Sequence, residues 1–301
     1  MKVLVTGGRG FIGQHCLPQL LAKGYDVHAV SSSPQNSTVG VQWHQANLLD
    51  VTQIAPLLRT VSPSHLLHLA WYTEHGKYWT SRKNLNWVQA SLSLMHEFAE
   101  SGGQRFVAAG TCAEYDWAYD ICDEVSTPCR PATLYGAAKY STHLLLESWS
   151  MHSSLSSAWG RIFNVYGPGE HPSRLVPSVI HSLLGGEPAL CTNGEHERDF
   201  MYVEDVAAAC VILLNSDVRG AVNIASGESV PLKDVVYTIA QQLGRRDLVR
   251  MGAVPCNVNE PVNLIADISR LQYEVGFRPS YKLKQGIALT IESVNKILQS
   301  S

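Results

Sequence analysis

Two side chains that could transfer protons stand four residues apart, at Tyr135 and Lys139, in a segment (132–151) whose composition favours a helix. This spacing places them on one helix face, one turn apart. An ammonium group beside a phenol favours the phenolate, so the tyrosine could exchange protons nearer neutral pH than a free phenol, whose pKa is about 10. Thr111 follows the apolar run 106–109, and we expect its hydroxyl at the carboxyl end of a strand, near the tyrosine. These residues suit proton transfer at a carbonyl or an alcohol.

A glycine-rich turn near the N-terminus predicts the partner of this chemistry. A short apolar run, Val3–Val5, precedes glycines with the spacing G-x-x-G-x-x-G, and a helix-permissive segment at 11–22 follows. Strand, tight turn and helix in this order are typical of a dinucleotide site, in which the phosphates meet the free N–H groups of the helix N-terminus. A plain glycine-rich surface turn is the alternative, which the preceding strand disfavours. The contacts expected from the turn are Gly7, Gly10, Phe11, Ile12 and Gly13.

The end of the second predicted strand indicates which dinucleotide binds. NAD sites usually place an acidic residue there for the ribose hydroxyls. Here the run from Asp26 to Val30 continues into Ser31, Ser32 and Ser33. Hydroxyls with a nearby cation would accept a 2′-phosphate, and Arg9 in the glycine turn could supply that cation. We therefore favour NADP(H) over NAD(H). The alternative is that Arg9 is an exposed loop charge and the serines form an ordinary turn.

Composition narrows the class of protein. The chain has 301 residues, 45% of them hydrophobic, and a net charge of −3 without a Lys/Arg run, so nucleic acid is not an expected partner. We see neither a signal peptide nor an apolar run long enough to cross a bilayer, and we expect a cytoplasmic enzyme. Seven cysteines without a C-x-x-C pair predict reduced thiols, and the twelve scattered histidines predict no metal site.

Strands and helices alternate along the first half of the chain. This order predicts an α/β protein with a doubly wound parallel sheet, the Rossmann fold. After residue 167 the rhythm breaks and prolines become frequent, so we expect residues 1–167 to bind the dinucleotide and residues 168–301 to form mostly a smaller substrate-binding region, with some later segments returning to the sheet. The expected strands lie at 3–5, 27–30, 41–44, 65–70, 106–109 and 157–162, and the expected helices at 11–22, 51–59, 81–101 and 132–151.

These pieces together resemble the extended short-chain dehydrogenase/reductase superfamily, in its nucleotide-sugar epimerase/dehydratase branch. The resemblance implies that Thr111, Tyr135 and Lys139 are the catalytic residues, with Tyr135 and Lys139 also touching the cofactor. It implies further cofactor contacts from Asn47, Leu48, Leu69 and Ala70, and a homodimer formed through the helices near 81–101 and 132–151. The matching segments are 6–13, 68–70, 111–115, 135–139, 161–169 and 198–206.

The resemblance also implies where the substrate lies. Asn164 would touch the diphosphate or the sugar, and Arg198 would bind a phosphate. No arginine stands at 254–257, where we would expect one, so Arg174 becomes a further candidate for the diphosphate. Trp71 and Tyr115 would line the sugar pocket.

The residues after Thr111 depart from the branch in an informative way. Sugar 4,6-dehydratases carry an Asp-Glu pair there, whereas this chain has Cys112 and Ala113, so water elimination is a poor interpretation. Glu114 is expected to be a solvated loop carboxylate. Three hypotheses remain: an NADP(H)-dependent reductase of a nucleotide-linked keto sugar, in particular a 4-keto-6-deoxy sugar; a 4-epimerase with tightly bound NAD; and a non-catalytic NADP-binding protein.

Overall fold

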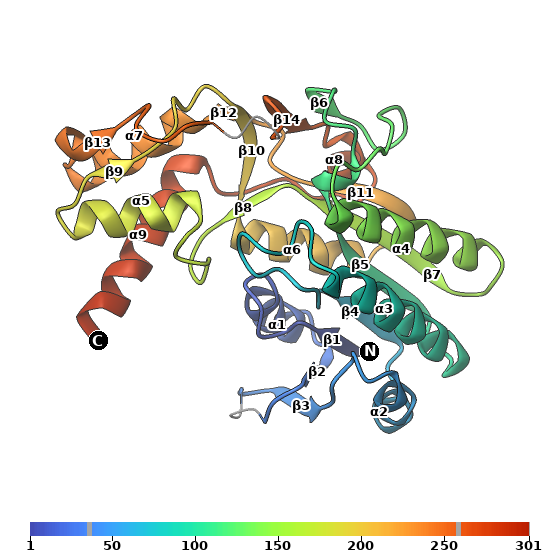
Figure 1. The fold of residues 1–301 in the computed structure, drawn as a ribbon. Helices are drawn as coiled ribbons and strands as arrows, with labels where there is room; N and C mark the ends of the chain where they lie inside the picture. The colour runs from blue at the N-terminus through green and yellow to red at the C-terminus, as the bar shows by residue number, and fades with distance from the viewer. Residues whose placement is uncertain (35–37, 257–259, 301) are drawn as a thin grey trace.

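A seven-stranded parallel sheet forms the centre of the protein (Figure 1). The computed structural model describes residues 1–34, 38–256 and 260–300. Every strand expected in the first half is present in this sheet, and the α/β prediction is confirmed. In spatial order the strands are β11 (Gly220–Ile224), β7 (Ser156–Ile162), β5 (Arg105–Thr111), β4 (His65–His68), β1 (Lys2–Thr6), β2 (Asp26–Ser31) and β3 (Val41–Gln45).

Helices cover both faces of the sheet, so its central strands are apolar on both sides. Along β1, Val3 and Val5 pack into one core with α1 (Gly13–Ala22) and α6 (Val203–Leu214). Leu4 faces the opposite core, which is built with α2 (Ile54–Val61), α3 (Lys83–Glu100) and α4 (Leu134–Met151). Figure 1 shows α1 beside α6, and α3 beside α4, as expected for a doubly wound fold.

The remaining elements form a smaller lobe. Its core is built by α5 (Leu175–Leu184), α7 (Leu232–Leu243) and α9 (Leu283–Ser300), seen to the left in Figure 1. A second sheet contains β12 (Ser229–Pro231), β10 (Glu197–Tyr202), β14 (Asn263–Ala266) and β6 (Ile121–Cys122), and β8 (Asn164–Tyr166) also pairs with β10. The other elements are β9 (Ala189–Leu190), β13 (Val249–Arg250), α8 (Ser269–Tyr273), and the short 3₁₀ turns η1 (Val51–Gln53), η2 (Cys112–Glu114) and η3 (Arg246–Leu248).

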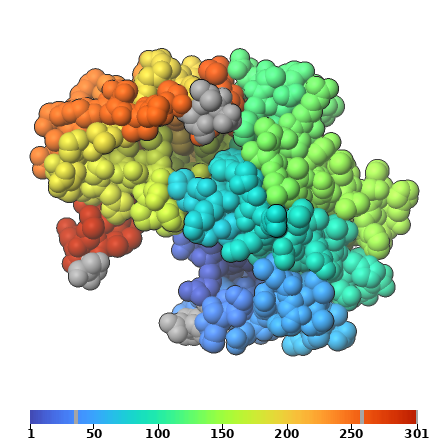
Figure 2. Space-filling model, in the orientation of Figure 1, coloured from blue at the N-terminus to red at the C-terminus, as the bar shows by residue number. Residues whose placement is uncertain are grey.

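The chain that leads into the small lobe contacts the first helix beside the large sheet. His15 on α1 contacts the carbonyl oxygen of Pro168 through Nε2 at 3.0 Å. Gln19, also on α1, donates to the carbonyl of Glu204 on the neighbouring α6 at 3.0 Å. Figure 2 shows residues near 71–82, in cyan, at the centre of this face between the lobe and the sheet. Within the described ranges no helix has the length and apolar character needed to cross a membrane.

Candidate active site

Thr111, Tyr135 and Lys139 come together at the carboxyl end of β5. Thr111 is the last residue of the strand, and the tyrosine and lysine lie in the first two turns of α4. The three residues are 8%, 9% and 3% exposed, respectively. Thr111 is close enough to the phenol of Tyr135 to favour its charged form, so it opposes part of the rise in the pKa of that phenol. The three residues therefore lie together as the sequence spacing predicts, and their side chains are buried.

Local hydrogen bonds fix the start of α4. The hydroxyl of Thr133 caps the helix by accepting the N–H of Gly136 at 3.1 Å. The N–H of Tyr135 donates to the carbonyl of Trp79 at 3.0 Å. One turn later, Lys139 donates from Nζ to the carbonyl of Ala109 on β5 at 2.7 Å. The helix is thus tied to the strand that carries Thr111 and to the segment that follows β4.

Burial sets the protonation of this site. It lowers the pKa of Lys139 to about 7, an effect that Glu114 opposes. Burial also raises the pKa of Tyr135 well above its ordinary value, and neighbouring Tyr78 adds to the rise. The expectation that the lysine moves the tyrosine towards phenolate is therefore wrong for this structure, because loss of solvation dominates. Tyr135 is a phenol at neutral pH, the form that donates a proton.

Glu114, three residues after Thr111, has a structural role. Glu114 is fully buried and accepts the N–H of Thr111 at 2.9 Å, the indole N–H of Trp159 at 2.8 Å and Arg161 Nε at 2.9 Å. The expectation of a solvated loop carboxylate is wrong, because partners from β7 enclose it. Burial raises the pKa of the Cys112 thiol to about 12, so this group stays protonated.

The glycine turn fits a dinucleotide. Gly7 has φ +71°, and a Cβ there would lie 2.7 Å from the N–H nitrogen of Ala70. A Cβ at Gly13 would lie 2.1 Å from the carbonyl oxygen of Gly7, so α1 approaches the strand only because the side chain is absent. Gly10 is exposed beside this close contact, and Phe11 and Ile12 are half-buried at the start of α1. A pyrophosphate could therefore meet the helix N-terminus. Leu69 and Ala70 lie against the same turn.

Arg9 and the serines after β2 lie together. Arg9 Nη1 donates to Ser33 Oγ at 3.2 Å, and the Ser31 hydroxyl lies 3.5 Å from that of Ser33. Ser32 is exposed next to them. The contact of this cluster with a 2′-phosphate, and with it the preference for NADP(H), stays a prediction.

Asn47 and Leu48 follow β3 at the same edge of the sheet. Asn47 is exposed, and its Oδ1 accepts the N–H of Leu49 at 3.2 Å. Leu48 is buried in the core, so only its main chain could contact an adenine.

The two predicted sugar-pocket residues have different surroundings. Tyr115 is 0% exposed, and its hydroxyl donates to Asn223 at 2.7 Å and accepts from Arg161 at 3.0 Å. Its predicted substrate contact is wrong, because the side chain is sealed inside the core. Trp71 lies near the triad, but its indole N–H donates to Asn84 at 2.9 Å and one ring face is covered by Lys139 at 3.9 Å. We therefore remove Tyr115 from the substrate site, whereas a substrate contact of Trp71 stays a prediction.

Three polar residues remain as substrate candidates. Asn164 is half-buried on β8 and donates to the carbonyl of Asp199 at 3.2 Å. Arg174 precedes α5, and its guanidinium lies 5.7 Å from the centre of the Tyr78 ring. Arg198 is buried and donates to the carbonyls of Pro261 and Val262 at 2.7 and 2.9 Å. Its role as a phosphate ligand stays a prediction, whereas its observed contacts hold the 260–262 segment against β10.

Several residues of the site did not stand out in the sequence. Tyr78 meets the ring of Tyr135 edge-on at 4.9 Å, and Trp79 does so at 5.8 Å. His75 stacks on His171 from the small lobe, with ring centres 5.6 Å apart. Near that stack, burial raises the pKa of Glu170 to about 8, opposed by Arg174. The dense aromatic content of 71–79 was the available signal, but it does not tell which rings cover the tyrosine.

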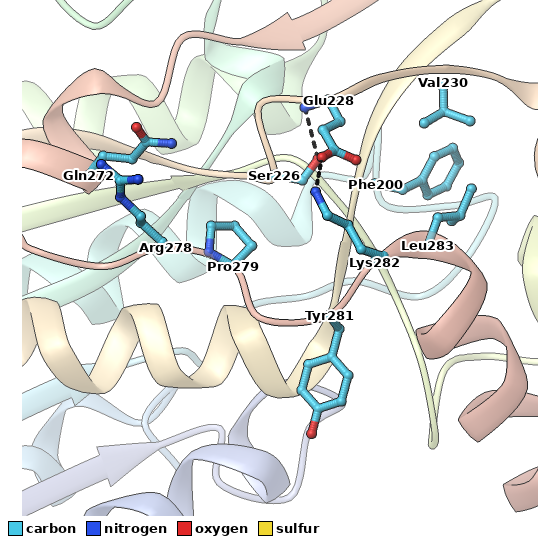
Figure 3. A pocket seen from close by; sticks show the side chains of 10 residues that line it. All are labelled: Phe200, Ser226, Glu228, Val230, Gln272, Arg278, Pro279, Tyr281, Lys282 and Leu283. Carbon is cyan, nitrogen blue, oxygen red and sulfur yellow. Dashed lines mark hydrogen bonds and ion pairs between the residues drawn. The ribbon is translucent and has the colours of Figure 1, made fainter.

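A separate pocket of about 190 Å³ lies in the small lobe and contains none of the predicted site residues (Figure 3). Phe200 and Leu283 line one side, and Lys282 points towards Glu228, with which it forms an ion pair. Tyr281 points away from this pair. The aromatic segment after β4 covers the triad, so this pocket and the candidate chemistry are at different places.

The chain is similar to known proteins along most of its length. The family model "NAD dependent epimerase/dehydratase family" matches residues 3–225. Among curated relatives, dTDP-4-dehydro-6-deoxyglucose reductase from Escherichia coli is 24% identical over 309 residues, covering 97% of each chain. UDP-glucose 4-epimerase from Rhizobium meliloti (strain 1021) is 25% identical over 308 residues, covering 94% of this chain and 93% of its own. The structure of MoeE5 in complex with UDP-glucuronic acid and NAD is 28% identical, with a TM-score of 0.86 over 99% of this chain and 100% of that one. The chain belongs to the NAD-dependent epimerase/dehydratase family of enzymes, whose members here are nucleotide-sugar epimerases, dehydratases and reductases.

Proposed function

We propose that this enzyme reduces a nucleotide-linked keto sugar, in particular a 4-keto-6-deoxy sugar, with NADP(H). The observation that carries the proposal is the buried Thr111–Tyr135 pair, in which the tyrosine is held as a phenol. Glu114 is the only carboxylate of the adjoining turn η2, and its ion pair with Arg161 keeps it from serving as an acid or a base. A proton donor without a neighbouring acid–base carboxylate suits reduction of a carbonyl better than elimination of water. The similarity to a dTDP-sugar reductase supports the same chemistry.

The residues would share the reaction as follows. Thr111 and Tyr135 hold the carbonyl oxygen of the sugar between their hydroxyls. A dinucleotide, when bound at the glycine turn, would supply the hydride that the carbonyl carbon accepts. Tyr135 gives its proton to the oxygen, which becomes the alcohol, and solvent later restores the phenol. Lys139 lies one turn further along α4, where its ammonium would hold the nicotinamide ribose.

Charged groups suggest how the nucleotide end binds. Arg174 stands at the N-terminus of α5, a ten-residue helix whose N–H groups and dipole favour an anion. We assign binding of the substrate diphosphate to Arg174 and Asn164, with Arg198 as a further phosphate ligand. For the cofactor, the Arg9–Ser33 contact supports a 2′-phosphate, which is the reason for preferring NADP(H) to the NAD of the MoeE5 complex.

We also propose a cell compartment for the enzyme and a role for each part of the chain. All seven cysteines are free thiols, which is consistent with a reducing compartment, and we place the enzyme in the cytoplasm. We assign dinucleotide binding to residues 1–167 together with α6 and β11, and substrate binding mostly to the rest.

A 4-epimerase that keeps its NAD is the second candidate, favoured by the similarity to UDP-glucose 4-epimerase. The crowding of Tyr135 by Tyr78 and Trp79 argues against it, since an epimerase must let the keto sugar turn over. A non-catalytic NADP-binding protein is the third, and the complete triad disfavours it.

A single preparation separates these candidates. One portion of the purified protein is denatured to identify any bound dinucleotide. A second, native portion is incubated with NADPH and 4-keto-6-deoxy sugars linked to dTDP, UDP, GDP or CDP. Loss of nicotinamide absorbance in proportion to the alcohol formed supports the reductase. Tightly bound NAD with interconversion of 4-epimers, and no consumption of NADPH, replaces it with the epimerase.

A further inference from the structure

The side chain of Lys139 is enclosed by unusual partners. Its ammonium nitrogen lies 3.9 Å from the centre of the Trp71 indole and 5.9 Å from that of Trp159. The carbonyl of Ala109 accepts one of its protons. Because the lysine is 3% exposed, water contributes little to the solvation of its charge. An aromatic face within about 6 Å is one of the few groups that can replace that water.

The indole of Trp71, which covers the lysine, is held by a hydrogen bond and by a stacked ring. Its N–H donates to Asn84, which is itself fully buried and donates to the carbonyls of Tyr78 and Ser81 at 2.7 and 2.9 Å. Its ring stacks on that of Trp87 on α3, with centres 6.3 Å apart and planes 27° apart. Trp71 follows β4, whereas Lys139 comes from α4, so two separate elements meet at this contact.

We propose that Trp71 is the positioning residue of Lys139: its indole face holds the ammonium over β5 and favours the charged lysine. The inference deepens the proposed function, since it concerns the lysine of that site, but it does not require knowledge of the sugar. It also explains how a deeply buried lysine remains protonatable near neutral pH without a carboxylate in contact.

The titratable groups facing Lys139 set the background against which the indole acts. Glu114, on the turn after β5, favours the charged lysine from a distance. The lysine in turn disfavours charge on His68 of β4, whose pKa burial already lowers to about 3, so this histidine stays neutral. Tyr135, on the same helix, is a neutral phenol. The pKa of Lys139, which burial lowers to about 7, places the change of its charge near neutral pH.

The test measures the pKa of Lys139 directly, by NMR of protein labelled with ¹³C at the lysine ε-carbon, with Lys139→Met assigning the signal. Trp71→Phe keeps an aromatic face and should leave the pKa within a few tenths of that of the parent protein. Trp71→Leu should lower it by about one pH unit, the equivalent of a desolvated cation–π contact. Trp87→Leu, which removes the stacked ring but not the covering one, is the matched control and should change it little.

Several results would overturn the proposal: an unchanged or raised pKa in folded Trp71→Leu, or an equal fall in Trp71→Phe and Trp71→Leu. If Trp71→Leu does not fold, mono-, di- and tetrafluorotryptophan at position 71 take its place, because fluorine weakens the ring's attraction for a cation with little change of shape. The lysine pKa should then fall stepwise with fluorine content, and a constant value rejects the inference. These titrations use neither substrate nor cofactor, so they can fail or succeed independently of the proposed reduction.

Discussion

Glu114 and Arg161 form a buried ion pair directly behind the candidate catalytic threonine, with Arg161 Nε 2.9 Å from Glu114 Oε2 and side chains that are 0% and 3% exposed. The other carboxylate oxygen accepts the N–H of Thr111 itself. Arg161 also donates to Tyr115, which reaches Asn223 on β11. The position of Thr111 therefore depends on β7 and β11 as well as on its own strand.

Removing one partner of the Glu114–Arg161 pair should destabilise the folded protein. Glu114→Ala leaves the guanidinium of Arg161 buried without its anion, and we expect a loss of about 3–5 kcal/mol in the free energy of unfolding. Chemical denaturation measures it. Glu292→Ala, which removes the exposed Glu292–Lys296 pair on α9, is the control and should hardly move the transition. Equal transitions for the two variants would contradict the structural role of Glu114.

The sequence predicts the parts of this site that depend on local spacing. The glycine turn, the strand ending in Thr111 and the helix carrying Tyr135 each depend on residues close together in the chain. The surroundings of Glu114, Tyr115 and Trp71 do not. Each is covered by residues from distant strands or helices, so neither burial nor partner can be read from neighbouring positions. This is why Glu114, expected in solvent, and Tyr115, expected at a sugar, proved to be structural.

Cofactor choice tests the Arg9–Ser33 contact. Arg9→Ala should weaken NADPH binding by about 1.5–3 kcal/mol, on the order of ten- to a hundredfold, because it removes a charged donor to the 2′-phosphate. NADH affinity should change little. Fluorescence titration with both dinucleotides gives the ratio, with Arg59→Ala on α2 as the control. Equal losses for NADPH and NADH would reject the phosphate assignment.

The depressed pKa of Lys139, about 7, makes dinucleotide binding dependent on pH. The ammonium that would hold the ribose is present below that value and is lost as the pH rises through it. The dissociation constant of NADH should therefore increase between about pH 6 and 8. Lys139→Met carries no proton at any of these values and should bind more weakly with a flat profile. A parallel rise in both proteins would assign the titration to another group.

Exposed leucines support the predicted homodimer. Leu85 on α3 is 57% exposed, and Leu144 and Leu145 on α4 are 45% and 50% exposed. Met95 and Phe98, by contrast, belong to the internal core and cannot contribute. We expect a two-fold dimer by light scattering, converted to a monomer by Leu145→Arg, whereas Leu289→Arg on α9 should leave it intact. A monomer at every concentration of the parent protein would exclude this assembly.

Tyr135→Phe tests the central role most directly. The change keeps the ring that packs against Tyr78 and Trp79 and removes only the hydroxyl, so folding and dinucleotide binding should persist. Because general acid catalysis typically contributes about 10²–10⁴-fold, kcat on the reactive keto sugar should fall by that factor. Thr111→Ser should be mild and Thr111→Val severe, since the hydroxyl alone is needed. Tyr78→Phe is the matched control, for it removes a neighbouring phenol that donates nothing to the carbonyl. Near-normal turnover in Tyr135→Phe would mean that the proton comes from another group and that the proposed mechanism is wrong.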